Sequence, residues 1–381
     1  MDIPGSRWVE IRIDALRHNY KLIQKIVGDC FVCPVVKANG YGLGAVDVAR
    51  VFTEEGALML AVTTVNEGIE LREAGIPAPI LVMAPFLEEE ASLLVRYRLT
   101  GTVVRREQLE ALEEAYTGSR IAVHLKVETG LGRSGIDLQD FPELVAWMRE
   151  REDLFEVEGV YSVLADASKI RYTDRQIDRF RAYLEVLERE GVRVSYRHLA
   201  NSLATLERPG THFDMVRVGT ALYGQLPPKA RNRLPLKNPW QVKARVISSS
   251  KIPGESSVGY DLDHVTRKTE RVAVIPLGWA DGLGVVARRR PRWLVHFFWD
   301  ALIQAAKRVL GRDVEYVIIR GKRYFFVGRS AMGLSTILVD ERVQVGDIAY
   351  VTMRRVTTDS RLPRVYLEDD RVIRITGPGV E

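Results

Sequence analysis

The chain has 381 residues, of which 46% are hydrophobic, so it can form two domains with a sizeable core, and one of them could be a large barrel. Its 55 basic and 50 acidic residues give a net charge of +5, which provides no argument for a nucleic-acid or membrane partner. The chain shows no signal-peptide pattern and no apolar run of about 18 residues, so we expect a cytoplasmic protein.

Between residues 9 and 224, amphipathic helices alternate with short apolar strands. Helices are predicted over 15–26, 45–55, 65–74, 87–97, 107–115, 141–150 and 173–190, with a short one around Leu203. Strands are predicted over 31–36, 58–62, 80–83, 102–104, 121–127, 157–164, 196–199 and 215–218. About eight strand–helix units imply a parallel sheet with right-handed crossovers, and they suit a (β/α)8 barrel of TIM type. Reactive groups in such a barrel lie at the C-terminal ends of the strands.

A proline-containing linker over 225–235 ends this alternation. Strands are then predicted over 241–249, 271–277, 314–319, 324–327, 336–339, 348–353, 364–367 and 372–375. We therefore predict a barrel over 1–235 and an all-β domain over 236–381, with the alternative that the first strand joins the β domain. A basic run precedes a helical insertion near 288–311, which either packs on the β domain or a subunit interface, or lies on a membrane surface.

The most informative segment is PVVKANGYGLG over 34–44, where an apolar strand ends at Lys37 and a glycine-rich turn follows. Lysine is costly to bury, and desolvation lowers the pKa of a lysine so that its amine becomes nucleophilic at neutral pH. A Schiff base with pyridoxal phosphate requires such an amine. The alternative is a lysine whose amine simply reaches the surface.

Cys30 and Cys33 form a C-x-x-C pair within a predicted strand. A zinc or redox site would require a second pair or a helix that begins at the first thiol. We therefore expect two reduced, buried cysteines and no metal site.

A series of segments, in order along nearly the whole chain, resembles the alanine racemase family. They lie at 8–19, 35–44, 126–133, 198–202, 216–224, 258–260, 276–282 and 327–332. The resemblance implies a pyridoxal-phosphate barrel followed by a β domain, assembled as a head-to-tail homodimer with shared active sites. It implies that the substrate is a small amino acid, by default alanine, whose L and D forms are interconverted.

The resemblance also implies two catalytic bases, Lys37 and Tyr260, on opposite faces of the substrate Cα, with Tyr260 supplied by the partner subunit. Two bases are needed because a single base tends to return the proton to the face from which it came. An unperturbed tyrosine has a pKa of about 10, so such a base needs cationic neighbours.

The remaining site residues are also implied by the resemblance. Arg217 would face the pyridine nitrogen and, because a guanidinium keeps its proton, would favour proton transfer over decarboxylation. His198 would orient Arg217, and Tyr41, Ser202, Gly219 and Thr220 would bind the cofactor phosphate. Arg133 and Met332 would bind the substrate carboxylate, with Lys126 positioning Arg133. Trp279 would lie at the active-site entrance.

The chain departs from the family pattern at several positions. Val163 and Leu43 stand where histidines are usual, Asp261 replaces glycine, Gly333 replaces aspartate and Trp279 replaces tyrosine. The family's late phosphate-binding tyrosine is not recognisable, and the 288–311 insertion has no counterpart. Two alternatives to alanine racemisation therefore stay open: a divergent homologue that racemises another amino acid, and a non-catalytic protein that binds pyridoxal phosphate.

Overall fold

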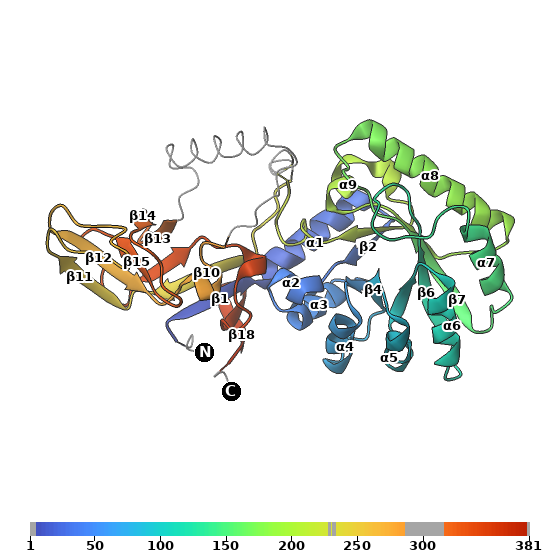
Figure 1. Cartoon of the computed structure of the whole chain (residues 1–381), viewed down its shortest axis with the longest axis horizontal. Helices are drawn as coiled ribbons and strands as arrows, with labels where there is room; N and C mark the ends of the chain where they lie inside the picture. The colour runs from blue at the N-terminus through green and yellow to red at the C-terminus, as the bar shows by residue number, and fades with distance from the viewer. Residues whose placement is uncertain (1–4, 228–229, 231–233, 286–315, 379–381) are drawn as a thin grey trace. The chain divides into compact units, whose positions relative to one another are not determined.

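The computed structural model describes residues 5–227, 230, 234–285 and 316–378. The chain divides into two compact units, one of residues 13–239 and one that combines residues 1–12 with 240–381 (Figure 1). Each unit has its own core.

The first unit is a closed barrel of parallel strands. The strands are β2 (Phe31–Pro34), β3 (Leu60–Val62), β4 (Ile80–Pro85), β5 (Thr100–Val103), β6 (Ile121–Lys126), β7 (Phe155–Tyr161), β8 (Tyr196–His198) and β9 (Met215–Val218). Strands β3 to β8 pair in sequence order, and β2 pairs with β9. A parallel bridge from Val35 to Ala61 joins β2 to β3, and a hydrogen bond from Arg217 N to Ala200 O links β9 to the chain after β8.

Helices surround the barrel strands (Figure 1). They are α1 (Ile13–Val27), α2 (Lys37–Tyr41), α3 (Ala45–Glu54), α4 (Val65–Glu73), α5 (Ala91–Arg96), α6 (Arg106–Glu114), α7 (Phe141–Arg149), α8 (Ile170–Arg189) and α9 (Ser202–Glu207). Helix α1 shows why they pack there, because Leu16, Tyr20 and Ile23 repeat at helical spacing and are all buried. Helix α4 begins with a capping box between Thr64 and Glu67.

The second unit is built on one sheet with the order β11-β12-β15-β14-β13-β16-β10-β1-β17-β18. Its strands are β1 (Arg7–Arg12), β10 (Trp240–Arg245), β11 (Ser248–Ile252), β12 (Glu270–Ile275), β13 (Tyr316–Ile319), β14 (Lys322–Phe326), β15 (Ser335–Leu338), β16 (Ile348–Val351), β17 (Arg364–Glu368) and β18 (Arg371–Thr376). Trp8, Val365 and Leu367 form part of its core.

Three sequence predictions need correction. The barrel was placed over 1–235 with the alternative that the first strand joins the β domain; β1 pairs with β10 and β17, so that alternative is correct, and the boundary falls after residue 239. The strand predicted over 241–249 is two strands, because β10 pairs with β16 whereas β11 pairs with β12. The helix predicted over 87–97 is a short 3₁₀ turn followed by α5. The predicted 288–311 insertion lies outside the described residues.

Candidate functional site

A cavity of about 690 Å³ opens at the C-terminal ends of the barrel strands. Its lining includes eight predicted site residues from the ends of four strands, β2, β6, β8 and β9, namely Lys37, Tyr41, Lys126, Arg133, Ser202, Arg217, Gly219 and Thr220. His198 lies beneath the cavity in contact with Arg217. The barrel therefore brings together the residues predicted for it from segments almost 200 positions apart.

Lys37 lies three residues after the end of β2 and begins a tight turn in the left-handed region of backbone conformation. Ala38, Asn39 and Tyr41 have φ angles of 52°, 53° and 55°, which L-residues rarely adopt. Glu67 stabilises the turn, since its Oε1 accepts a 2.6 Å hydrogen bond from the Ala38 amide. A strained backbone held by its surroundings is frequent at functional sites. It fixes the position of Lys37, which is half-buried at the cavity wall.

Ser202, Gly219 and Tyr41 form a narrow cradle in the cavity wall. The Ser202 hydroxyl accepts hydrogen bonds from the Gly219 amide at 3.1 Å and from the Ala221 amide at 3.4 Å. A Cβ atom at position 219 would lie 2.2 Å from the Tyr41 hydroxyl. Only glycine at position 219 therefore allows the Tyr41 ring to lie against this loop. The same ring packs on Tyr223, with 4.6 Å between the ring centroids.

Gly219→Ala tests this cradle. We expect the added methyl to displace Tyr41, to destabilise the fold by roughly 1–3 kcal/mol and to weaken binding of the phosphate group that the family resemblance implies here, measured by fluorescence titration with pyridoxal phosphate. Gly210→Ala is the matched control, because nothing lies within 4 Å of a Cβ built there. Equal cofactor affinity in both variants would contradict the role of Gly219.

Arg217 is almost fully buried at the base of the cavity. Its Nη1 donates to His198 Nδ1 at 2.8 Å and to the His198 carbonyl at 3.1 Å, and its Nη2 donates to the Ser162 carbonyl at 2.7 Å. The guanidinium also packs over the Tyr161 ring, 4.8 Å from its centroid. Burial, followed by the charge of Arg217, holds the pKa of His198 well below its ordinary value, so this imidazole is neutral at pH 7.

Lys126 ends β6 and donates to the Ser134 hydroxyl at 2.7 Å. Burial, and then the charges of Arg133 and Arg217, lower the pKa of Lys126 to about 8. Arg133 itself is exposed on the cavity rim. The amine of Lys126 is thus protonated below pH 8 and neutral above it, and the positive charge of this corner of the cavity changes within a moderate pH range.

A pH titration of ligand binding follows from this. We expect the affinity for propionate, a carboxylate without an amine, to fall by roughly threefold to tenfold between pH 7 and pH 9 as Lys126 loses its proton. Lys126→Arg should keep the affinity nearly constant over that range, because arginine stays charged. Isothermal titration calorimetry in carbonate-free buffer measures both. A wild-type affinity independent of pH would contradict the assignment.

The predicted residues of the β domain line a groove of that unit. Tyr260, Trp279 and Met332 line one open groove of about 1020 Å³. Hydrogen bonds from the Trp279 amide to Ala331 O and from the Ala280 amide to Met332 O hold its segments together. The three side chains are 67%, 53% and 60% exposed, so the groove presents a large apolar surface.

The departures from the family pattern have different surroundings. Val163 lines the barrel cavity, where it presents an apolar side chain in place of an imidazole. Leu43 is fully buried in the barrel unit. Asp261 forms an ion pair with Arg329, and both line the groove of the β unit.

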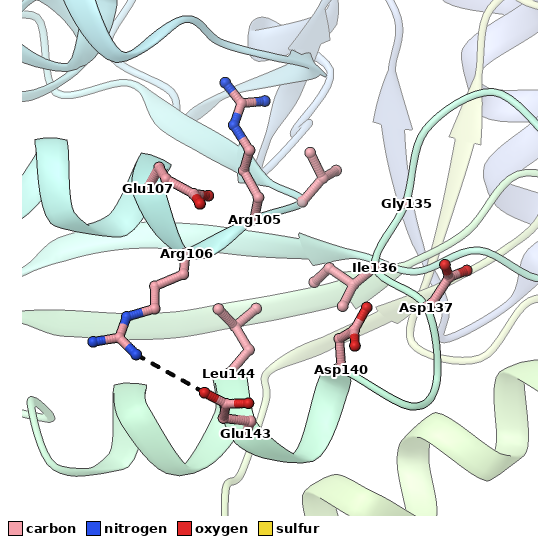
Figure 2. Close-up of a pocket in the computed structure, with 10 residues that line it drawn as sticks. Arg105, Arg106, Glu107, Gly135, Ile136, Asp137, Asp140, Glu143 and Leu144 are labelled. Carbon is pink, nitrogen blue, oxygen red and sulfur yellow. Dashed lines mark ion pairs between the residues drawn. The ribbon is translucent and has the colours of Figure 1, made fainter.

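Another hollow, of about 300 Å³, lies between the start of α6 and the start of α7 and contains none of the predicted site residues. Figure 2 shows its charged lining and the ion pair between Arg106 and Glu143. The Arg106 Nη1 and Glu143 Oε1 atoms of this pair lie 3.9 Å apart. Among the described residues no group of three or more potential ligands could hold a metal ion. Within the same part of the chain, no helix is both long and apolar enough to cross a membrane.

Sequence reasoning missed several residues at the site. Glu67 supports the Lys37 turn, Tyr161 and Met83 line the cavity, and His124 contacts His198. For Tyr161 and Met83 the sequence position could have served as the signal, since Tyr161 ends β7 and Met83 lies two residues before the end of β4. Nothing local in the sequence marks Glu67, which acts from the neighbouring helix.

Comparison with known proteins agrees with this geometry. Residues 11–227 match the family model for the alanine racemase N-terminal domain, and residues 240–362 match the model for the alanine racemase C-terminal domain. The chain belongs to the alanine racemase family. The alanine racemase of Carboxydothermus hydrogenoformans is 36% identical over 350 residues, covering 90% of this chain and 88% of that protein. That of Halalkalibacterium halodurans is 31% identical over 402 residues, covering 97% of each.

Solved structures show the same relationship. The alanine racemase of Clostridium difficile 630 superposes with a TM-score of 0.85 at 26% identity and 100% coverage of both chains. That of E. faecalis gives 0.79 at 30% identity, with 95% of this chain and 98% of that chain covered. The predicted family, the barrel-plus-β fold class and the assignment to the amino-acid racemases are thereby confirmed.

Proposed function

We propose that this chain interconverts L- and D-alanine with pyridoxal phosphate as cofactor. The observation that carries the proposal is the barrel cavity, which places Lys37, Arg133 and Arg217 around one space lined by the Ser202–Gly219 cradle. The relatives named alanine racemase support the choice of alanine.

The residues present fit the cofactor. The cradle offers a hydroxyl, a tyrosine and close backbone approach at Gly219 for a phosphate group. Arg217 uses three of its five N–H donors on His198 and Ser162, which leaves one on Nη2 and one on Nε for a ring nitrogen in the cavity. Pyridoxal phosphate, when bound, withdraws electrons from the substrate Cα and so acidifies its C–H bond.

The chain's own groups would then move the proton. The Lys37 amine would hold the cofactor covalently and, once released, accept or return the Cα proton on one face. Arg133 would bind the substrate carboxylate, for which a guanidinium is suited, with the Met332 backbone as its proposed partner. Arg217 would keep its proton, so the pyridine nitrogen stays unprotonated and loss of carbon dioxide is disfavoured.

The second base and the oligomeric state belong to the same proposal. Tyr260 is exposed in a groove whose apolar rim a second copy of the chain could cover. We infer a homodimer in which Tyr260 of one subunit faces the cavity of the other, with Trp279 near the entrance.

The deciding experiment incubates the purified protein with single L-amino acids and follows the products by chiral chromatography. Appearance of D-alanine ahead of all other D-amino acids is expected. Racemisation of a different amino acid would favour a divergent homologue, for which Val163 in the cavity wall is the notable feature. Cofactor binding without any racemisation would favour a non-catalytic protein.

Mixing two inactive variants tests the shared sites. Tyr260→Phe should bind cofactor but lose exchange on one face of Cα, and Lys37→Ala should lose the other base. After subunit exchange, hybrid dimers contain one intact site, so about a quarter of the wild-type activity should return. If both bases came from one chain, the mixture would stay inactive. Size-exclusion chromatography verifies the dimer.

A cytoplasmic location is the last part of the proposal. Its support is that Cys30 and Cys33 are both free thiols, as expected of a reducing compartment. Cell fractionation tests it.

A further inference from the structure

A row of buried polar side chains runs from Arg217 into the barrel interior. His198 Nε2 lies 2.9 Å from His124 Nδ1, and His124 Nε2 lies 3.3 Å from Glu158 Oε2. The two imidazoles are fully buried, and the Glu158 side chain is 18% exposed. Four strands, β9, β8, β6 and β7, each contribute one residue to this row.

The donors and acceptors of the row can be assigned from one end. A guanidinium only donates, so His198 Nδ1 must accept from Arg217 and its proton must lie on Nε2. That proton is donated to His124 Nδ1, which leaves the His124 proton on Nε2, the atom that faces Glu158. An ionised carboxylate only accepts, so every contact in the row has the same direction, from Arg217 toward Glu158.

The charges of Arg217 and Glu158 support the same direction of the hydrogen bonds. Burial, as the largest cause, lowers the pKa of both imidazoles, so neither competes with Arg217 for the positive charge. Within the described part of the chain, Arg217 donates to the His198 ring and to the carbonyl groups of His198 and Ser162, and to no carboxylate. A buried guanidinium is costly without a counter-charge, and the carboxylate at the far end of this polarised row supplies one. The last contact of the row is the loosest: among the described residues no acceptor meets His124 Nε2 at hydrogen-bond geometry, and Glu158 Oε2 lies 3.3 Å from it.

We propose that Glu158 and His124 are positioning residues for Arg217. The carboxylate fixes the direction of the hydrogen bonds, so that both imidazoles keep one tautomer and the two remaining N–H groups of Arg217 stay directed to the cavity. The consequence for catalysis rests on the proposed function, whereas the tautomers and their dependence on Glu158 do not.

Nitrogen NMR of protein labelled at its histidine side chains tests the tautomers without any variant. Protonated and unprotonated ring nitrogens differ widely in chemical shift, and His124→Gln and His198→Gln identify the two rings. We expect each ring to be neutral with its proton on Nε2. A proton on Nδ1 of either ring, or a doubly protonated ring, overturns the proposal.

Glu158→Gln tests the charge, because the amide keeps the size and an acceptor oxygen. We expect it to shift the His198 ring signals, two contacts away, and the visible absorption of the bound cofactor. Turnover of alanine should fall roughly tenfold with little change in KM, the size of effect common for groups that orient an active-site residue. Glu156→Gln, an exposed glutamate on the same strand, is the matched control and should change none of these.

The outcomes separate the two hypotheses. Unchanged His198 signals and unchanged cofactor absorption in Glu158→Gln overturn the proposal, whatever the enzyme's substrate. The expected tautomers and shifts in a protein without racemase activity would leave the row established and reject the proposed function. If Glu158→Gln folds poorly, Glu158→Asp keeps the charge at a longer distance and should shift the same signals by a smaller amount.

Discussion

Replacing Lys37 with alanine should slow the interconversion of L- and D-alanine by at least roughly 10²- to 10⁴-fold, the loss expected from the missing base alone. The variant should also lose the visible absorption of the holoprotein, because no amine remains in the position that follows β2. In the wild type, borohydride should fix the cofactor to the peptide that contains Lys37. Peptide mass spectrometry and the chiral assay measure the two effects.

Two controls give this result its meaning. Lys169→Ala removes an exposed lysine that lies outside the barrel cavity and should leave rate and spectrum unchanged. Added methylamine should restore part of the activity of Lys37→Ala, since it can supply the missing amine to an intact cavity. A Lys37→Ala protein that stays yellow and active would reject the central assignment.

Arg217→Glu should change the type of reaction as well as its rate. In the wild type we expect deuterium uptake at Cα to exceed release of carbon dioxide by far. The guanidinium of Arg217 keeps its proton, so the pyridine nitrogen of the cofactor stays unprotonated and the ring withdraws electrons less strongly. A carboxylate at position 217 can share a proton with that nitrogen and strengthen the electron withdrawal of the ring. Exchange should fall roughly 10²- to 10³-fold, while the ratio of carbon dioxide release to exchange rises at least about tenfold.

Lysine at the same position is the comparison that keeps the charge. Arg217→Lys should lower the exchange rate but leave the ratio of the two reactions nearly as in the wild type. Because Arg217 is almost fully buried, thermal melting of each variant shows whether the cavity is still formed. Equal product ratios in Arg217→Glu and wild type would contradict the proposed contact between Arg217 and the cofactor.

Much of the architecture was predictable because it depends on local patterns. Apolar residues at helical spacing in α1, and short apolar runs such as that of β6, bury the same faces in the structure as the pattern implies. The first strand shows the limit, because the sequence left open which domain it joins, and Trp8 and Val9 pair with residues more than 200 positions away. The residues of an apolar strand are enough to recognise it as a strand, but they do not tell with which other strand it pairs.

The candidate site divides in the same way. The sequence by itself determined the residue types and the strand ends that carry them, since Lys37, Arg217 and the glycine loop stand in recognisable segments. Only the tertiary structure decided that Glu67 holds the Lys37 turn and that Glu158 lies at the end of a row from Arg217. The physical reason is that a barrel brings the interior side chains of distant strands into contact, and hydrogen bonds and charges act over a few ångströms of space, whatever the separation along the chain.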